Sequence, residues 1–376
     1  MASIVVLGSG MVGHVIAQDL AQVHQVVVVD KNPSSLEKLN RIKNIRTQVA
    51  DVQNKDLLYT LVQQADLVVI ALPGFMAFEV LKHVIECGKS VVDISFYPEN
   101  ALDLNTLAKE KKVTVIVDSG VAPGMSNFLL GYHYATGMQI DEFICYVGGL
   151  PIERTFPFEY KAPFSPSDVI EEYIRPARLK EHGQIVVKPA LSEIELIYFE
   201  GIGTLEAFNT DGLRSLLYTM NIPNMKEKTL RYPGHATLIQ ALKTIGFFDE
   251  QEREINHCRI RPIQLSTQLL RDAWKLRPNE EEFTVMRVII KGKENGQSVQ
   301  YTYDLLDKYD KLTGFTSMSR TTGFACTAMA QLILEKKLTQ HGVFPPELVA
   351  LNKDIFKYVM TYLTDRKVHY RCSVNT

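Results

Sequence analysis

The chain has 376 residues, 46% of them hydrophobic and 22% charged, with a formal net charge of −2; these values are typical of a globular protein of two domains. The charge balance gives no electrostatic reason to expect nucleic acid or an anionic membrane as a partner. No apolar run approaches the ~18 residues of a membrane span, and the five widely spaced cysteines show no metal-ligand spacing. We therefore expect a cytoplasmic protein with reduced thiols and no metal site.

A strand, a glycine turn and a helix are predicted at the start of the chain. Residues 4–7 are a short apolar β-branched run, typical of a buried strand, and apolar side chains then recur at helical spacing from residue 15 to residue 20. The intervening turn has the pattern G-x-G-x-x-G, in which the three glycines allow a tight turn, close approach of a pyrophosphate and close packing of the helix on the sheet. The turn consists of Gly8, Ser9, Gly10, Met11, Val12 and Gly13.

Asp30 follows the second predicted strand, residues 26–29. A carboxylate at this point can accept hydrogen bonds from the adenosine ribose, and it repels a 2′-phosphate. The spacing therefore predicts a bound nicotinamide dinucleotide, NAD in preference to NADP. Lys31 lies directly beside this acid and offers a cation that would tolerate NADP.

Strands and helices continue to alternate up to residue 124. Strands are predicted at 67–73, 90–94 and 113–117, with helices at 78–85 and 101–111, and this order is typical of a doubly wound parallel sheet, a Rossmann domain. Ligands bind beyond the carboxyl ends of such strands. Two segments are placed to contact the cofactor, although either could be an ordinary loop: Asp51 and Val52 at the adenine, and Ala71, Leu72 and Pro73 at the nicotinamide.

From about residue 140 the pattern changes to an α+β domain with an open mixed sheet. Its predicted strands are 141–146, 195–199 and 283–290, the last continuing through a hairpin into 298–303, and residues 147–151 are interpreted as a turn. Helices follow at 320–335 and within 346–362. The mixed Lys and Glu residues at 226–228 and 291–294 are interpreted as solvated surface.

Motifs along nearly the whole chain resemble the saccharopine dehydrogenase superfamily, and most closely its lysine 6-dehydrogenase branch. Two positions indicate that branch: saccharopine reductases usually carry an acid in place of Ala122 and a cysteine in place of Val147. The matching stretches are GSGMVG at 8–13, DSGVAPGM at 118–125, YVGGLP at 146–151, LSE at 191–193, LEAFNT at 205–210, LRYPGH at 230–235, RTT at 320–322 and GVFPPE at 342–347.

The resemblance implies NAD-dependent oxidative deamination of the lysine side-chain amine, giving ammonia, NADH and an aldehyde that cyclises to piperideine-6-carboxylate. It also implies that the C-terminal helices return to the Rossmann domain. The expected division is 1–124 with 323–376 for cofactor binding, and 125–322 for binding an amino-acid substrate and for assembly into a homodimer or homotetramer.

Such a reaction needs a neutral amine, a cation for the α-carboxylate and a carboxylate for the α-ammonium. Arg231 is the expected carboxylate clamp, unless it forms a surface ion pair. His235 is a base or water-orienting group, or equally a structural histidine. Asp93 and Asp118 end parallel strands, where each contacts ligand or caps a turn. The remaining candidates are Tyr97, Glu159 and Tyr160 for the substrate pocket, and Thr210 with Asp211 as substrate ligands or turn formers.

Two other functions compete with amine oxidation. The same site could join an amino acid to an aldehyde reductively, as saccharopine and carboxynorspermidine enzymes do. A chain with this fold could also be a non-catalytic NAD-binding sensor, because fold alone does not establish activity.

Overall fold

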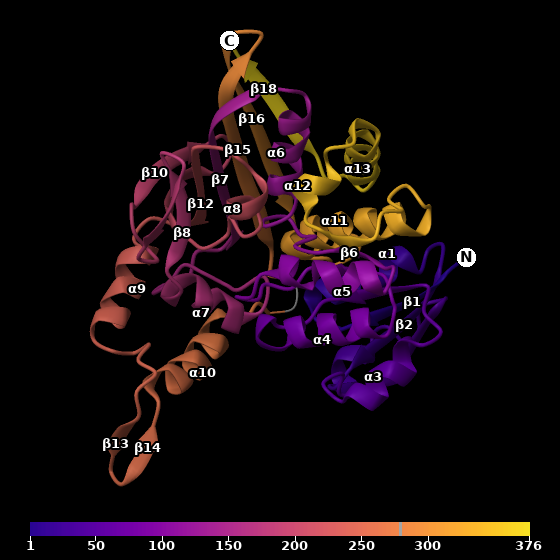
Figure 1. The fold of residues 1–376 in the computed structure, drawn as a ribbon. Helices are drawn as coiled ribbons and strands as arrows, with labels where there is room; N and C mark the ends of the chain where they lie inside the picture. The colour runs from indigo at the N-terminus through magenta and orange to yellow at the C-terminus, as the bar shows by residue number, and fades with distance from the viewer. Residues whose placement is uncertain (278–279) are drawn as a thin grey trace.

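The structure is a computed structural model that describes residues 1–277 and 280–376, with the backbone alone at residues 166 and 167. Two sheets organise it: a seven-stranded sheet in the N-terminal part and a nine-stranded sheet in the middle of the chain. Figure 1 shows the N-terminal domain beside a group formed by α7 (Pro166–Ile174), α9 (His235–Thr244) and α10 (Pro262–Trp274). The predicted combination of a Rossmann domain and a mixed-sheet domain is confirmed.

The first sheet is parallel throughout, in the order β17-β6-β5-β4-β1-β2-β3. The strands predicted at its centre are all present. The sheet gains two edge strands that the apolar pattern did not indicate, β3 and β17. Its strands are β1 (Ser3–Leu7), β2 (Gln25–Asp30), β3 (Ile45–Val49), β4 (Leu67–Ile70), β5 (Val91–Asp93), β6 (Thr114–Ile116) and β17 (Gly342–Phe344).

Helices cover both faces of this sheet. Along β1, Ile4 and Val6 pack in one apolar cluster, and Val5 and Leu7 pack in another on the opposite face. The first cluster includes side chains of α1 (Met11–Leu20), α11 (Ser317–Leu334) and α13 (Lys353–Asp365), and the second those of α3 (Lys55–Val62), α4 (Gly74–Glu86) and α5 (Asn105–Glu110). The shorter helices of this domain are α2 (Pro33–Leu36) and η1 (Ala101–Leu104), the 3-10 turn that precedes α5.

The second sheet has the order β10-β11-β12-β7-β15-β16-β18, with β8 and β9 joined at β12. The pair β12–β7 is parallel and its other pairs are antiparallel, so the sheet is mixed. Its strands are β7 (Gln139–Pro151), β8 (Ala177–Glu181), β9 (Gln184–Lys188), β10 (Glu195–Phe199), β11 (Gly203–Asn209), β12 (Asn224–Arg231), β15 (Glu282–Glu294), β16 (Gln297–Lys308) and β18 (Tyr370–Asn375).

The turn predicted at residues 147–151 is wrong, because β7 runs unbroken to Pro151 and pairs with β15 along this stretch. The two glycines serve close packing instead. A Cβ at Gly148 would overlap the backbone of Leu230, and one at Gly149 would press on Pro163 and Met318. Glycine in a strand here marks the close approach of neighbouring chain.

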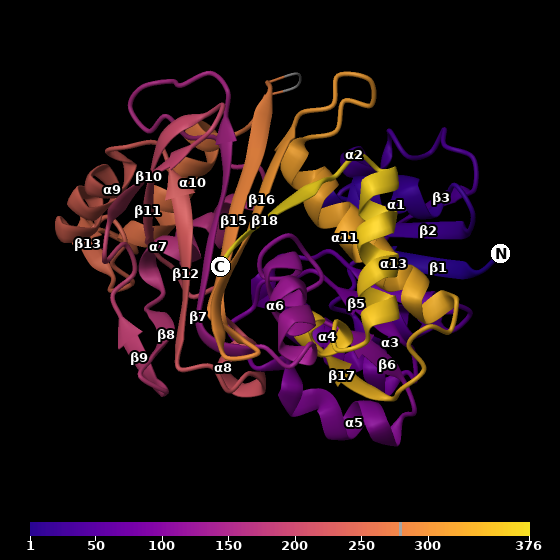
Figure 2. The same cartoon turned by 90° about the horizontal axis from the view of Figure 1, so that it is seen from above.

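Figure 2 shows α6 (Met125–Ala135) and α11 between the second sheet and the first. The end of the chain contributes to both sheets: β17 pairs with β6, and β18 pairs with β16. The division of the chain at residues 124 and 322 stays a prediction. A hairpin of β13 (Arg253–Ile255) and β14 (Cys258–Ile260) projects below α10 (Figure 1), and the short helices α8 (Leu216–Thr219) and α12 (Pro346–Val349) complete the fold.

Within the described parts of the chain, no helix has both the length and the apolar character that crossing a membrane takes.

Candidate active site

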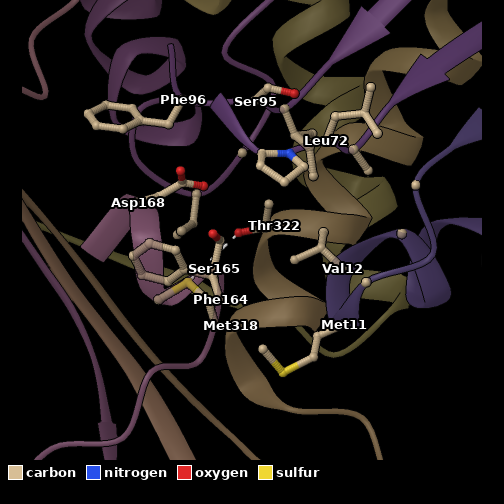
Figure 3. A pocket seen from close by; sticks show the side chains of 18 of the residues that line it. Met11, Val12, Leu72, Ser95, Phe96, Phe164, Ser165, Asp168, Met318 and Thr322 are labelled. Atoms are coloured by element: carbon tan, nitrogen blue, oxygen red, sulfur yellow. Dashed lines mark hydrogen bonds between the residues drawn. The ribbon is translucent and has the colours of Figure 1, made fainter. Parts of the chain in front are cut away.

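A cavity of about 830 Å³ opens between the two domains. The N-terminal domain contributes the loops that follow β1, β2, β4 and β5, the point at which parallel sheets bind ligands. The second domain contributes residues from β7, β12 and α7, together with Lys275 directly after α10. Figure 3 shows the part in which Val12, Leu72 and Ser95 of the N-terminal domain approach Phe164, Ser165 and Asp168 of the second domain, and in which Thr322 of α11 also lies.

The glycine turn forms one end of the cavity. Gly8 has φ +103°, and a Cβ at Gly8 or Gly13 would overlap backbone atoms of Ala71 or Gly8 respectively. Gly10, in contrast, faces open space, and it begins α1 with no side chain capping the helix. The first N–H groups of α1 are therefore directed to an uncapped hollow, which fits a pyrophosphate.

Asp30 lies beside this hollow with a fixed orientation. One carboxylate oxygen accepts the N–H of Ser9 and the other the N–H of Asn32, both at 2.8 Å. Ser9 is not among the lining residues; it contributes this N–H while its hydroxyl donates to Ser35 O at 2.9 Å. The other residues predicted to bind cofactor all line the cavity: Met11, Val12, Lys31, Asp51, Val52, Ala71, Leu72 and Pro73.

Charged groups gather at the opposite end of the cavity. Glu227, Thr229 and Arg231 alternate along β12 and therefore face the same side, into the cavity. Asp168 and Glu172 lie four residues apart on α7, so they share a helix face. Thr210 lies 3.0 Å from Thr229 and Gly212 adjoins the carboxyl group of Glu227, so both belong to this end, and Lys275 also lines the cavity. Three carboxyl groups thus face two cations here.

Arg231 is 2% exposed, so the alternative of a surface ion pair is wrong. Its Nη2 lies 2.8 Å from Glu172 Oε2, Nε donates to Tyr173 Oη at 3.0 Å, and Nη1 donates to Leu230 O at 2.9 Å. The guanidinium also lies over the Tyr160 ring, 4.3 Å from its centroid. Burial raises the pKa of Glu172, and Arg231 opposes this shift. A substrate carboxylate would therefore have to share Arg231 with Glu172.

Both halves of the chain match one family. Residues 4–116 match the model of the saccharopine dehydrogenase NADP binding domain, and residues 120–368 match the model of the saccharopine dehydrogenase C-terminal domain. The chain belongs to the saccharopine dehydrogenase family. The N-terminal cradle is accordingly that of a nicotinamide dinucleotide, which its glycine turn and Asp30 fit.

Relatives agree with this membership at low identity. A saccharopine dehydrogenase [NADP(+), L-glutamate-forming] of Pyricularia oryzae is 27% identical over 265 residues, which are 67% of this chain and 59% of that protein. An alpha-aminoadipic semialdehyde synthase of Arabidopsis thaliana is 25% identical over 255 residues, 64% of this chain and 24% of that protein. The chain thus spans less than two thirds of the length of these relatives.

A solved structure shows the same fold. The apo saccharopine dehydrogenase (L-Glu forming) of Saccharomyces cerevisiae matches with a TM-score of 0.82 at 17% identity, over 100% of both chains. A homospermidine synthase of Legionella pneumophila in complex with NAD matches with a TM-score of 0.67 at 14% identity, over 100% of this chain and 91% of that one.

His235, expected as a base in this family member, does not line the cavity. Its Nδ1 lies 2.9 Å from Phe158 O, which can only accept, so Nδ1 carries the proton and Nε2 accepts from Tyr173 Oη at 3.0 Å. Burial, followed by the charge of Arg231, lowers the pKa of His235 to about 3. The structure corrects the assignment as base: His235 is a neutral structural histidine that holds Tyr173 against Arg231.

Asp93, Tyr97 and Asp118 form a buried group that does not reach the main cavity. Asp118 lies 3.2 Å from Nη2 of Arg214, which also donates to the carbonyl of Tyr97. Asp93 accepts the N–H of Ser95 at 2.9 Å, and burial raises its pKa to about 7. None of the three therefore lines the cavity at which ligand contacts were predicted, and the group instead supports the loop that carries Ser95 into the cavity wall.

The remaining substrate candidates differ in position. Glu159 pairs with Arg154 at 2.5 Å on the surface, away from the cavity. Tyr160 is buried behind Arg231 and acts through that guanidinium. Thr210 does line the cavity, with its hydroxyl 3.0 Å from that of Thr229. Asp211 instead pairs with Arg178 at 2.8 Å.

None of the three carboxyl groups at this end was predicted from the sequence. Glu227 was included in the stretch interpreted as solvated surface, yet it is 5% exposed, and Lys228 is equally buried. The alternation of Glu227, Thr229 and Arg231 was the available signal, since it places the acid on the same face as the expected clamp. Asp168 and Glu172 carried the corresponding helical signal, a spacing of four.

Proposed function

We propose that this protein oxidises the side-chain amine of L-lysine with NAD, releasing ammonia and an aldehyde that cyclises to piperideine-6-carboxylate. The charge composition of the substrate end carries this proposal. Asp168, Glu172 and Glu227 outnumber Arg231 and Lys275 there. L-Lysine has the opposite composition, two ammonium groups and one carboxylate, whereas saccharopine has three carboxylates and would require an excess of cations.

The two positions that separate the lysine 6-dehydrogenase pattern from that of saccharopine reductases support the same substrate. Ala122 and Val147 both line the cavity, so the acid and the thiol that saccharopine reductases carry at these positions would be absent from the site itself. Small uncharged side chains there leave the proton chemistry to the carboxyl groups of β12 and α7.

The residues of the chain divide the substrate between them. Lys275 is available to bind the α-carboxylate, and so is the N–H group of Arg231 Nη1 that does not donate to Leu230. The carboxyl groups are available to bind the ammonium groups of the substrate. When bound, the nicotinamide accepts the hydride from the carbon that bears the amine. The resulting iminium ion takes up water and releases ammonium, which leaves one proton for the protein and solvent to remove.

The expected assay is NADH formation by the purified protein with NAD and L-lysine between neutral and alkaline pH. Ammonia should appear in equal amount to NADH, and norleucine, which lacks only the side-chain amine, should give neither. NADH oxidation on mixing an amino acid with an aldehyde, without lysine-dependent NADH formation, would instead identify reductive C–N bond formation. Cofactor binding without either reaction would favour a sensor.

Assembly into a homodimer or homotetramer, which the resemblance implies, and residence in the cytoplasm, which the cysteine pattern led us to expect, remain proposals. Light scattering of the purified protein tests the first of them.

A further inference from the structure

Glu227 is the carboxyl group at the substrate end for which the structure shows no partner. It is 5% exposed, lines the cavity, and its side-chain oxygens accept no hydrogen bond from the described residues. Glu172 has Arg231 at 2.8 Å, and Asp168 has the backbone N–H of Gly74. Buried carboxyl groups are normally hydrogen-bonded, so an unpartnered one that faces a cavity indicates a missing ligand.

The groups around Glu227 oppose its ionisation. Burial is the largest effect, and Glu172 of α7, Asp211 after β11 and Asp118 after β6 add negative charge; together they raise its pKa to about 8. Arg214 is the cation that opposes them, and the thiol of Cys145 on β7 lies within electrostatic range. At neutral pH the free carboxyl group is therefore mostly protonated, and a bound cation would ionise it.

Gly212 leaves room for this carboxyl group. A Cβ at residue 212 would overlap the carboxyl group of Glu227, while the backbone at Gly212 has no positive φ that would itself require glycine. The absence of a side chain at Gly212 thus fixes where the Glu227 carboxyl group can sit.

We propose that Glu227 binds the reacting amine of the substrate and removes its proton. This rests on the proposed function, because the ammonium form has no lone pair with which to support loss of hydride. The proton passes from the side-chain ammonium nitrogen to a carboxylate oxygen, and the neutral amine then forms the iminium ion as hydride leaves its carbon. The carboxyl group of Glu227 is protonated in the ligand-free protein. It therefore first releases this proton to solvent when the ammonium group of the substrate binds.

Calorimetry on the protein loaded with NADH tests this without turnover. L-Lysine is titrated in two buffers that differ in ionisation enthalpy, which gives the number of protons released on binding. The wild-type protein should release close to one proton at pH 7 and close to none at pH 9.5, since the pKa is about 8. Norleucine, the probe without a side-chain amine, should release close to none at either pH.

Variants assign the proton to Glu227. E227Q should abolish the release at pH 7 and lower kcat/KM for lysine by roughly 100-fold or more. G212A should displace the carboxyl group and give a similar loss, and combining it with E227Q should add little. E142Q, which removes a surface carboxylate that pairs with Lys291 at 2.5 Å, should match the wild type.

Equal proton release with lysine and norleucine, or undiminished release in E227Q, would overturn the role of Glu227. The proposed function has a separate outcome. If L-lysine fails to bind but putrescine binds with proton release that requires Glu227, the lysine assignment is wrong and the amine site stands. If no amine releases a proton from the wild-type protein, the site is overturned as well.

Discussion

At the scale of single residues, Asp30 illustrates how backbone geometry prepares a side chain for its ligand. Each of its two oxygens already accepts one N–H, from Ser9 and from Asn32. These bonds fix the carboxylate at the rim of the cavity, while each oxygen retains a further lone pair for a ribose hydroxyl.

D30A should therefore weaken NAD binding by about 10- to 100-fold, the loss typical of hydrogen bonds to a charged group. NADP binding should change less or improve, because the repulsion of a 2′-phosphate disappears and Lys31 remains. Fluorescence titrations with NADH and NADPH measure both. Unchanged affinity for the two cofactors would show that Asp30 does not contact the ribose.

The position of a residue was predictable where the local sequence pattern determines it, and not where contacts with distant parts of the chain determine it. Asp30 follows a strand at a fixed spacing, so its place at the cavity follows from the sequence. His235 belongs to a segment of which Arg231 lines the cavity, but Tyr173 and Phe158 occupy both ring nitrogens of His235. Those contacts come from segments 62 and 77 residues away, and no local pattern contains them.

At the scale of elements, α7 contributes both to the wall of the cavity and to stability. It directs Asp168 and Glu172 into the cavity, and Glu172 neutralises the buried guanidinium of Arg231. Removing one partner of a buried ion pair leaves an uncompensated charge, which is more costly than loss of a surface pair.

E172Q should consequently lower the free energy of unfolding by about 3 kcal/mol. E171Q is the matched control on the same helix, because Glu171 pairs with Arg175 at 3.2 Å with 44% of its side chain exposed; its cost should stay below about 1 kcal/mol. Urea unfolding of both variants makes the comparison. Equal losses would mean that the Arg231–Glu172 pair contributes no more than a surface pair.

Elements were predictable in proportion to their apolar content. The central strands of the first sheet are continuous apolar runs and were identified, whereas β3 is largely exposed and β17 is three residues long. At 147–151 the two glycines of β7 have the composition of a turn, but their role is to admit Leu230, Pro163 and Met318. Leu230 and Met318 lie more than 80 residues away along the chain, and periodicity does not report such contacts.

At the scale of the whole molecule, the buried carboxyl group of Glu227 in the wall of the cavity makes stability depend on pH. Glu227 has a folded pKa of about 8, above its ordinary value of about 4.3. Glu227 therefore binds its proton more tightly in the folded state. The contribution of this group to the free energy of unfolding is greatest at a pH at or below its ordinary pKa, and it falls as the pH rises towards 8.

E227Q carries an amide that does not titrate, so its free energy of unfolding should rise relative to wild type between about pH 5 and pH 8. The slope of this difference is at most ~1.4 kcal/mol per pH unit, and it should level off above pH 8. Unfolding by urea at pH 5, 7 and 9 gives the difference, with E142Q expected to show none. A difference independent of pH would show that Glu227 ionises normally.

The two-domain architecture followed from the sequence, but the position of the chain's last segments did not. The return of the C-terminal helices to the first domain was implied by the resemblance, and α11 and α13 do pack in the same apolar cluster as α1. That β17 completes one sheet and β18 the other could not be inferred, because each is a short edge strand defined by its neighbours.

This arrangement has a consequence for synthesis of the protein on the ribosome. The apolar side of α1 emerges first, yet the helix that covers it, α11, begins at Ser317. Until α11 has emerged, the nascent first domain therefore exposes surface that is later buried, and each of the two sheets lacks one of its edge strands. Such exposure favours aggregation and chaperone binding. Slow or interrupted translation should thus harm the yield of this protein more than that of a protein whose domains are each continuous in sequence.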